Sequence, residues 1–326
     1  MGTGPLAAKF IQNPGFMATA GAVDQSNVKK EPISMNQALV GIIGGSGLYQ
    51  MDALEGAQEQ AISTPFGAPS DVLVTGRVHG VPVAFLARHA RGHRLLPFEV
   101  PYRANIHAMK QLGVRYLLSM SAVGSLKEDF KPLDMVLPDQ FIDLTKRRES
   151  TFFGRGAVAH VSMSQPVCPA ASGVLARAVR NVLALQAPGH GVTLHEGGIY
   201  VCIEVPQFSS VAESNWYRSM GGGVIGMTNM PEAKLAREAQ IAYTTLALVT
   251  DFDCWHPRQA HVTADMALAN LFKNAGRAQQ VAAEAIRLLG AEQPASDAHT
   301  ALKNALVTQP DAMAPEVRAR LAALLG

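Results

Sequence analysis

The sequence predicts an α/β fold: a single domain with a central mixed, largely parallel β-sheet flanked by helices. Short apolar runs rich in β-branched residues alternate along the chain with segments of helical periodicity, the order expected of parallel strands joined by helices. Several runs are apolar throughout, as are strands that helices cover on both faces. With 48% hydrophobic and 17% charged residues over 326 positions, the chain can also bury one large core.

The first half of the chain is expected to start the sheet after a long extension. Residues 1–27 lack the cationic start and apolar block of a secretory signal, and we expect residues 1–37 to be a disordered N-terminal extension. Strands are predicted at 39–43, 72–75, 81–86 and 116–120, with a hairpin turn at Val78-His-Gly80 and a helix over 102–112 that ends at Gly113. A turn of small residues, Ser121 to Ser125, follows the last of these strands.

The second half continues the same alternation. Strands are predicted at 134–138, 140–143, 198–203, 224–227 and 241–250, and helices at 170–185, 210–220, 231–240 and 264–289. A polar loop spans 145–156, and its basic run Lys146-Arg-Arg148 is expected to be solvated surface. Residues 291–326 form an Ala/Pro-rich tail with short helices.

Charge and cysteine content exclude several classes of protein. The net charge of +2, from 28 basic and 26 acidic residues, argues against a protein that binds nucleic acid or a membrane surface through an excess of positive charge. The cysteines number three and are widely spaced, so they form no disulfide framework and a reducing cytosol is the expected compartment. No apolar run approaches the ~18 residues of a membrane span.

Two carboxylates follow the apolar run that ends at Thr250. If the run is a buried strand, Asp251 and Asp253 leave its end on the same side, because side chains alternate with a period of two. Such a pair can exchange protons with one ligand that carries adjacent nitrogen groups, and ligands bind at the carboxyl ends of strands in α/β sheets. From these residues alone, a helix cap beside a solvated acid explains the pattern equally well.

A glycine-rich turn, Gly44-Gly-Ser-Gly-Leu48, follows the first predicted strand. Its free backbone N–H groups and the Ser46 hydroxyl suit an anion, although a plain tight turn remains an alternative. The turn matches neither the dinucleotide-binding pattern G-x-G-x-x-G nor the Walker A loop, and it misses the esterase pattern G-x-S-x-G because residue 48 is Leu.

Arg88 and His89 follow another apolar strand. The planar guanidinium of Arg88 can donate two parallel hydrogen bonds to a phosphate, and His89 can add a further donor. His89 and His93 have helical spacing for a metal, but Gly92 and the preceding strand argue against a helix, and no metal site is expected. Small hydroxyl residues follow two further strands, at Ser119–Ser125 and after Met227. The strand ends therefore predict a phosphate pocket beside the acidic pair.

In these motifs the chain resembles the 5′-methylthioadenosine phosphorylases, a branch of the trimeric purine nucleoside phosphorylases. The blocks that carry the resemblance are Gly44-Gly-Ser-Gly-Leu-Tyr49, Ala87-Arg-His89, Asn105-Ile106, Ala122-Val-Gly-Ser125, Asp139-Gln-Phe-Ile-Asp143, Phe208-Ser-Ser-Val-Ala-Glu-Ser214, Gly226-Met-Thr-Asn-Met-Pro-Glu232 and Thr250-Asp-Phe-Asp-Cys-Trp255. The likeness runs from about Val40 to Gly290 and implies a purine nucleoside phosphorylase-like catalytic domain over residues 38–290.

The resemblance implies a role for each matching residue. Phosphate binding falls to Ser46, Arg88, His89, Ser121 and Thr228, and substrate binding to Phe208 and Ser209 at the base, Met227 at the ribose and Ala264 at the 5′ group. The catalytic residues are Asp251, which protonates or hydrogen-bonds N7, and Asp253, which meets the 6-amino region. The implied reaction converts 5′-methylthioadenosine and phosphate to adenine and 5-methylthioribose 1-phosphate, because the phosphate below C1′ and the acid at N7 stabilise the charges of the transition state.

Substrate preference is implied by two positions. Relatives specific for 6-oxopurines have Asn where this chain has Asp251, and their 5′-hydroxyl-binding His aligns with Ala264. A carboxylate suits a 6-aminopurine, and a small apolar residue suits a methylthio group, because a buried hydroxyl without a partner is costly. Phosphorylases of methylthioinosine, adenosine, inosine or guanosine remain the nearest alternatives.

The family pattern Glu-Gly-Pro reads Glu204-Val-Pro206 here, and Gln207 stands where some relatives have Arg. If the glycine has a positive φ, Val205 is strained there, and a catalytically weakened nucleoside-binding relative becomes a further alternative. The resemblance also implies a homotrimer in which His160 reaches a neighbouring subunit, a cytoplasmic location, no nucleic-acid or membrane partner, and no cofactor other than the co-substrate phosphate.

Overall fold

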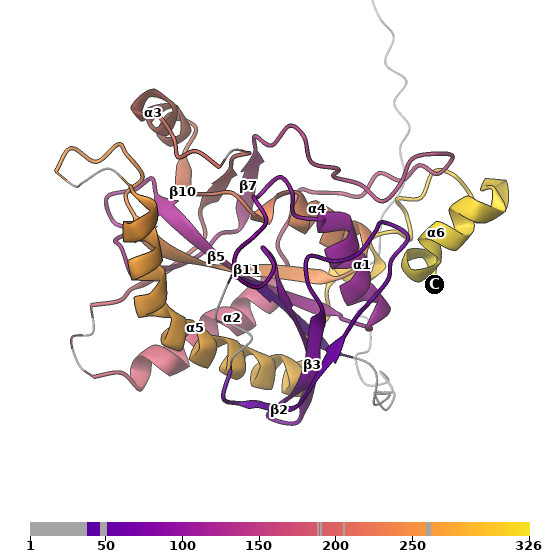
Figure 1. The fold of residues 1–326 in the computed structure, drawn as a ribbon, viewed down its shortest axis with the longest axis horizontal. Coiled ribbons are helices and arrows are strands. Elements are labelled where there is room, and N and C mark those ends of the chain that lie inside the picture. The colour runs from indigo at the N-terminus through magenta and orange to yellow at the C-terminus, as the bar shows by residue number, and fades with distance from the viewer. Residues whose placement is uncertain (1–37, 46–50, 188, 190, 205, 259–261) are drawn as a thin grey trace, which may run out of the picture. The chain divides into compact units, whose positions relative to one another are not determined.

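The structure is a computed structural model that describes residues 38–326 apart from 46–50, 188, 190, 205 and 259–261. Its described strands form one 11-stranded mixed sheet, and helices lie on both faces of this sheet (Figure 1). The predicted fold class is confirmed. Within the described residues, no helix combines the length and the apolar character needed to cross a membrane.

The sheet branches at β5 (Tyr116–Ser125), which runs parallel to β1 (Val40–Gly44) and to β11 (Ala242–Asp251). Its last two residues pair antiparallel with β10 (Gly222–Gly226). Three groups of strands continue the sheet outward: β4 (Val81–Ala87), β3 (Leu73–Val78) and β2 (Leu54–Gln60) beyond β1; β9 (Ile199–Cys202) and β7 (Gln140–Asp143) beyond β10; and β6 (Met135–Leu137) and β8 (Leu194–Glu196) beyond β11. The parallel pairing brings the carboxyl ends of β1, β4, β5 and β11 to one edge.

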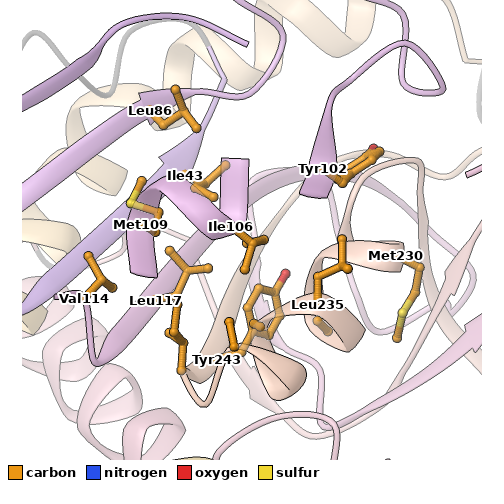
Figure 2. Packing of buried hydrophobic residues seen from close by; sticks show 14 of the residues in the cluster. Ile43, Leu86, Tyr102, Ile106, Met109, Val114, Leu117, Met230, Leu235 and Tyr243 are labelled. Atoms are coloured by element: carbon orange, nitrogen blue, oxygen red, sulfur yellow. The ribbon is translucent and has the colours of Figure 1, made fainter. Parts of the chain in front are cut away.

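Two apolar clusters cover the two faces of the sheet. Alternate residues of β1 belong to different clusters, Ile43 to one and Ile42 to the other, because strand side chains point to opposite faces. On the first face pack α1 (Tyr102–Gln111), α4 (Asn229–Glu238) and the C-terminal α6 (Pro315–Leu325). Figure 2 shows Ile106 of α1 and Leu235 of α4 as parts of this cluster. On the second face α2 (Pro169–Ala184) and α5 (Ala264–Glu292) pack against each other and the sheet.

The predicted helices are confirmed, with ends that differ by at most three residues. Local chemistry explains these ends: α3 (Val211–Ser219) begins with a capping box of Ser210 and Glu213, and the Cys168 thiol accepts a bond from the first turn of α2. The hairpin between β3 and β4 is also confirmed, and its turn residues His79 and Gly80 have φ of 48° and 75°.

One prediction of local structure is wrong, and two strands were not predicted. The segment from Ser121 to Ser125 is no turn, because pairing with β11 and β10 keeps these small residues extended within β5. The polar strand β2 was not predicted; its central residues are exposed and only its pairing with β3 defines it. The short strand β8 was not predicted either.

Candidate functional site

The predicted site residues gather at the carboxyl edge of the sheet in two groups. We call one group, Arg88, His89, Ser121 and Thr228, the phosphate side. The base side consists of the predicted residues Phe208, Ser209, Asp251 and Asp253, together with Ser214, which was not predicted. Both groups touch β5, through Ser121 and through Gly124, which lies opposite Asp251. Three strand residues span about 10 Å, so the two sides are neighbours. Ser46 and Val205 lie outside the described residues.

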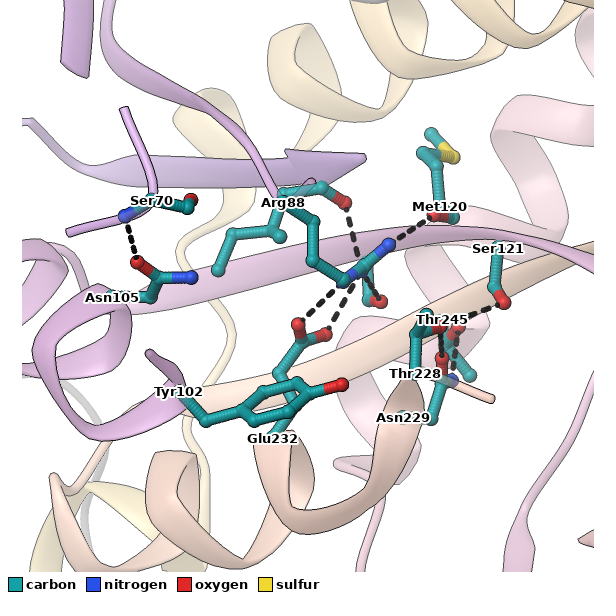
Figure 3. A network of polar contacts seen from close by, with 12 residues as sticks. Ser70, Arg88, Tyr102, Asn105, Met120, Ser121, Thr228, Asn229, Glu232 and Thr245 are labelled. Carbon is teal, nitrogen blue, oxygen red and sulfur yellow. Dashed lines mark hydrogen bonds and ion pairs between the residues drawn. The ribbon is translucent and has the colours of Figure 1, made fainter. Parts of the chain in front are cut away.

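Arg88 on the phosphate side is bound to Glu232 of α4. Its Nε and Nη2 donate to the two carboxylate oxygens at 2.8 and 3.1 Å, and both side chains are almost completely buried. The remaining N–H groups donate to the Met120 and Ile43 carbonyls and to Ser119 Oγ (Figure 3). Arg88 therefore reaches the predicted place, but Glu232 already neutralises its charge, so an incoming anion meets a guanidinium that is paired.

His89 is held as a neutral ring beside this pair. Its Nδ1 lies 2.8 Å from the Leu95 carbonyl, which fixes Nδ1 as the donor and leaves Nε2 as an acceptor. Burial and the nearby Arg88 cation lower the pKa of His89 to about 4. His93 stacks on His89 with ring centroids 4.4 Å apart. Among the described residues, no three His, Cys, Asp or Glu side chains are grouped to hold a metal ion.

The hydroxyls of Ser121 and Thr228 meet on the phosphate side at 3.1 Å. The buried Tyr200 hydroxyl of β9 also lies 3.1 Å from Ser121 Oγ. Tyr200 reaches this position across Gly226, where any Cβ would overlap its ring and hydroxyl. The structure thus brings together two of the predicted hydroxyls and adds a third from Tyr200, which the sequence analysis did not select.

A second buried arginine borders the phosphate side. The Arg148 side chain is 1% exposed and its Nε lies 2.7 Å from Glu204 Oε1. The prediction that the run containing Arg148 is solvated surface is therefore wrong for this residue, although Lys146 and Arg147 are exposed. The loop folds back because Glu204 also accepts from the backbone N–H of Lys146 and of Arg147. Nothing in the local charge pattern marks which of three basic residues turns inward.

Asp251 on the base side ends β11 and is 5% exposed. Its Oδ2 lies 2.6 Å from the Thr250 hydroxyl and its Oδ1 accepts the Asp253 N–H at 2.8 Å. Desolvation is the largest influence on the carboxyl and raises its pKa to about 6, with a further rise from the Asp253 charge. Gly124 makes room for this carboxylate, since a Cβ there would lie 2.9 Å from Asp251 Oδ1.

Asp253 follows in a turn with φ of 52°, and its backbone N–H binds Asp251 Oδ1. The predicted strand alternation is wrong, because β11 ends at Asp251 and Asp253 lies beyond it. Burial raises the pKa of Asp253, whereas the nearby hydroxyls of Ser214 and Ser209 lower it. Neither hydroxyl makes a hydrogen bond of good geometry in the free protein, although both are buried.

The other predicted binding residues are more exposed. Phe208 is 44% exposed ahead of α3, and the Ser209 carbonyl accepts from the Cys254 thiol at 3.2 Å, which ties this segment to the acidic pair. Met227 connects β10 to α4. Ala264 is exposed at the first residue of α5, and His160 is exposed with its backbone N–H bound to the Ala305 carbonyl. The contacts that unite the two sides do not include Ala264 or His160.

An edge that places two hydroxyls and a buried arginine beside two buried carboxylates suits cleavage of a glycosidic bond by phosphate. The chain belongs to the phosphorylase superfamily, whose family model matches residues 39–287. This confirms the family that the sequence motifs predict.

Within this family, the chain is similar to relatives that share one name. The chain is 59% identical to S-methyl-5′-thioadenosine phosphorylase of Synechocystis sp. over 293 residues, which are 90% of this chain and 88% of the relative. It is 51% identical to the enzyme of the same name from Rhodospirillum rubrum, with 89% of this chain and 97% of the relative covered.

Solved structures show the same likeness. A crystal structure of methylthioadenosine phosphorylase from an antarctic soil metagenomic library superimposes with a TM-score of 0.85 and 61% identity, covering 89% of this chain and 100% of the other. Methylthioadenosine phosphorylase from Schistosoma mansoni in complex with adenine superimposes with a TM-score of 0.74 and 36% identity, covering 89% and 98%.

Proposed function

We propose that the protein cleaves 5′-methylthioadenosine with phosphate to adenine and 5-methylthioribose 1-phosphate, a step of methionine and purine salvage. The observation that carries this proposal is the buried Asp251–Asp253 pair beside the hydroxyls and arginine of the phosphate side, on one edge of the sheet. The names of relatives at 51% and 59% identity support the choice of substrate.

In the proposed reaction phosphate lies among Arg88, His89, Ser121 and Thr228, with Ser46 as a further donor, and attacks C1′. The negative charge of an anion there favours a proton on His89 Nε2, which is an acceptor in the free protein. The developing positive charge at C1′ then faces the phosphate in a buried place, where electrostatic stabilisation is strong.

The purine leaves with help from Asp251. A carboxyl whose pKa is about 6 is protonated in roughly one molecule in ten at pH 7, so it can donate to N7 as negative charge builds on the base. Asp253, with Ser209, meets the 6-amino region, and Phe208 packs on the purine face. The Met227 backbone reaches the ribose, and the methylthio group lies toward Ala264.

The proposal extends to the assembly and its setting. We expect a cytoplasmic homotrimer in which His160 contacts a neighbouring subunit, with phosphate as co-substrate and no metal or organic cofactor. We expect no nucleic-acid or membrane partner, in keeping with the balanced charge of +2.

Release of adenine, measured with and without phosphate, tests the reaction. We expect release that requires phosphate and is faster from 5′-methylthioadenosine than from adenosine or inosine. Asp251→Asn is expected to lower kcat by roughly 10²–10³-fold, the loss typical when one stabilising group of a transition state is removed. The exposed Asp129→Asn serves as the control.

Other outcomes identify the alternatives. Preference for inosine would assign the protein to the 6-oxopurine enzymes. Binding of nucleoside without phosphate-dependent turnover would point to a nucleoside-binding relative, and Val205→Gly would then test whether that residue prevents catalysis.

A further inference from the structure

Arg148 connects three parts of the fold that border the phosphate side. At the end of β9, its Nε donates to Glu204 Oε1 and its Nη2 lies 3.0 Å from the Glu204 carbonyl and 3.2 Å from that of Ile203. Its Nη1 lies 2.9 Å from the Tyr102 hydroxyl of α1, 2.7 Å from the Met227 carbonyl and 2.6 Å from that of Met230. The side chain of Arg148, which was expected to be solvated, thus makes its hydrogen bonds with groups of the protein interior.

The Met227 and Met230 carbonyls belong to an irregular segment. Thr228 precedes α4 with φ −126° and makes no capping bond, and Met230 has the non-helical angles φ −117° and ψ 133°. Carbonyls in such a segment lack the regular partners of a helix, so a side chain must satisfy them. Arg148 supplies donors on both sides of Thr228.

The carboxylate of Glu204 completes this arrangement. It neutralises the guanidinium and accepts the backbone N–H groups of Lys146 and Arg147, so the loop that carries Arg148 is held at the end of β9. A planar guanidinium can serve acceptors in several directions at once, which a lysine ammonium on a flexible stem does less well.

We propose that Arg148 is a positioning residue for the phosphate side: it holds the segment from Met227 to Met230 so that the Thr228 hydroxyl stays beside Ser121 and the Met227 backbone faces the ribose. This inference rests on the proposed function and adds a residue whose side chain acts through the backbone around Thr228. The hydrogen bonds that connect the base side, from the Asp253 N–H to Asp251 and from the Cys254 thiol to the Ser209 carbonyl, do not include Arg148.

Arg148→Lys and Arg148→Met test the proposal, with Arg147→Lys and Arg147→Met as matched controls. Arg147 is the adjacent exposed residue, and its guanidinium lies 4.5 Å from the centre of the Phe98 ring. We expect both Arg148 variants to raise the KM for phosphate roughly 10- to 100-fold and to lower kcat, because charged hydrogen bonds are lost. Adenine affinity, measured by calorimetry, is expected to change less than about threefold, and the Arg147 variants are expected to match the wild type.

Equal losses of phosphate and adenine affinity would show a general structural role and overturn the proposal, as would Arg148 variants that behave like the Arg147 variants. Thermal unfolding identifies a variant that fails to fold. If Arg148→Met fails to fold, the result for Arg148→Lys, which keeps the charge, decides whether the proposal holds. If the wild type has no activity, the proposed function fails, while calorimetry of phosphate and adenine binding still tests the role of Arg148.

Discussion

The charged groups on the phosphate side are already paired within the protein, whereas two buried hydroxyls on the base side lack a hydrogen bond of good geometry. Arg88 is bound to Glu232 and the neighbouring Arg148 to Glu204, both in buried ion pairs. The hydroxyls of Ser209 and Ser214 lie close enough to Asp253 to lower its pKa, but neither forms a well-aligned hydrogen bond. The difference indicates that phosphate meets cations that are already paired, while the base can improve contacts that are poorly formed in the free protein.

The largest expected effect comes from breaking the pair on the phosphate side. Glu232→Gln leaves the Arg88 guanidinium, which is 2% exposed, without a neutralising charge. We expect the free energy of unfolding to fall by about 3–5 kcal/mol, the usual cost of removing one partner of a buried ion pair. Denaturant unfolding with and without phosphate measures it, and phosphate should raise the stability of the variant more than that of the wild type because it returns an anion to Arg88.

Glu238→Gln is the matched control. Glu238 is the other buried acid of α4, and unlike Glu232 it accepts hydrogen bonds from two neutral donors, Thr151 Oγ1 and the Phe152 N–H. Its pKa is raised by burial, so a neutral amide resembles its protonated form. We expect a loss near 1 kcal/mol. Equal losses in the two variants would show that the charge on Glu232 is not what matters.

The strand ends explain how much of this site is predictable from sequence. Arg88, Ser121 and Asp251 follow from apolar runs that end in polar residues, because parallel strands deliver such ends to one edge. Their partners do not follow: Glu232 lies 144 residues from Arg88, and Glu204 lies 56 residues from Arg148. Long-range pairing of this kind depends on the register of helices and loops, which a local pattern does not contain.

The fold is also predictable only where the signal is local. Buried strands and amphipathic helices were predicted because the spacing of their own apolar residues indicates the element, whereas β2 is defined only by its pairing with β3. The small residues from Ser121 to Ser125 predict a turn, but pairing with two neighbouring strands, and not local preference, decides their conformation.

On the base side, the raised pKa of Asp251 makes a prediction about stability. The carboxyl has a pKa of about 6 in the folded protein and about 4 when unfolded. Between these values the folded state binds more protons, so this contribution to stability is present below pH 4 and is lost as the pH rises through 6. Asp251→Asn cannot ionise and is therefore expected to be more stable than the wild type at pH 7.5, by roughly 1–3 kcal/mol, although it turns over slowly.

Unfolding of wild type and Asp251→Asn at pH 4 and at pH 7.5 measures this difference, with Asp129→Asn as the exposed control. The advantage of Asp251→Asn is expected to be small at pH 4, where the wild-type carboxyl is protonated in the folded state and about half protonated in the unfolded state. An advantage of the same size at both pH values would mean that ionisation of Asp251 does not oppose folding.

The smallest expected effect tests the poorly bonded hydroxyls directly. Ser214 is fully buried in α3 and its Oγ makes no well-aligned hydrogen bond in the free protein, so Ser214→Ala is expected to remove a polar group that contributes little to folding. We expect the free energy of unfolding to stay the same or rise by up to about 1 kcal/mol, since alanine also favours a helix. The KM for nucleoside is expected to rise about 3- to 10-fold, because the hydroxyl near Asp253 forms a well-aligned hydrogen bond only when the base is bound. A loss of stability above about 1 kcal/mol in denaturant unfolding would show instead that this hydroxyl is bonded before the substrate arrives, and the contrast between the two sides would then disappear at this residue.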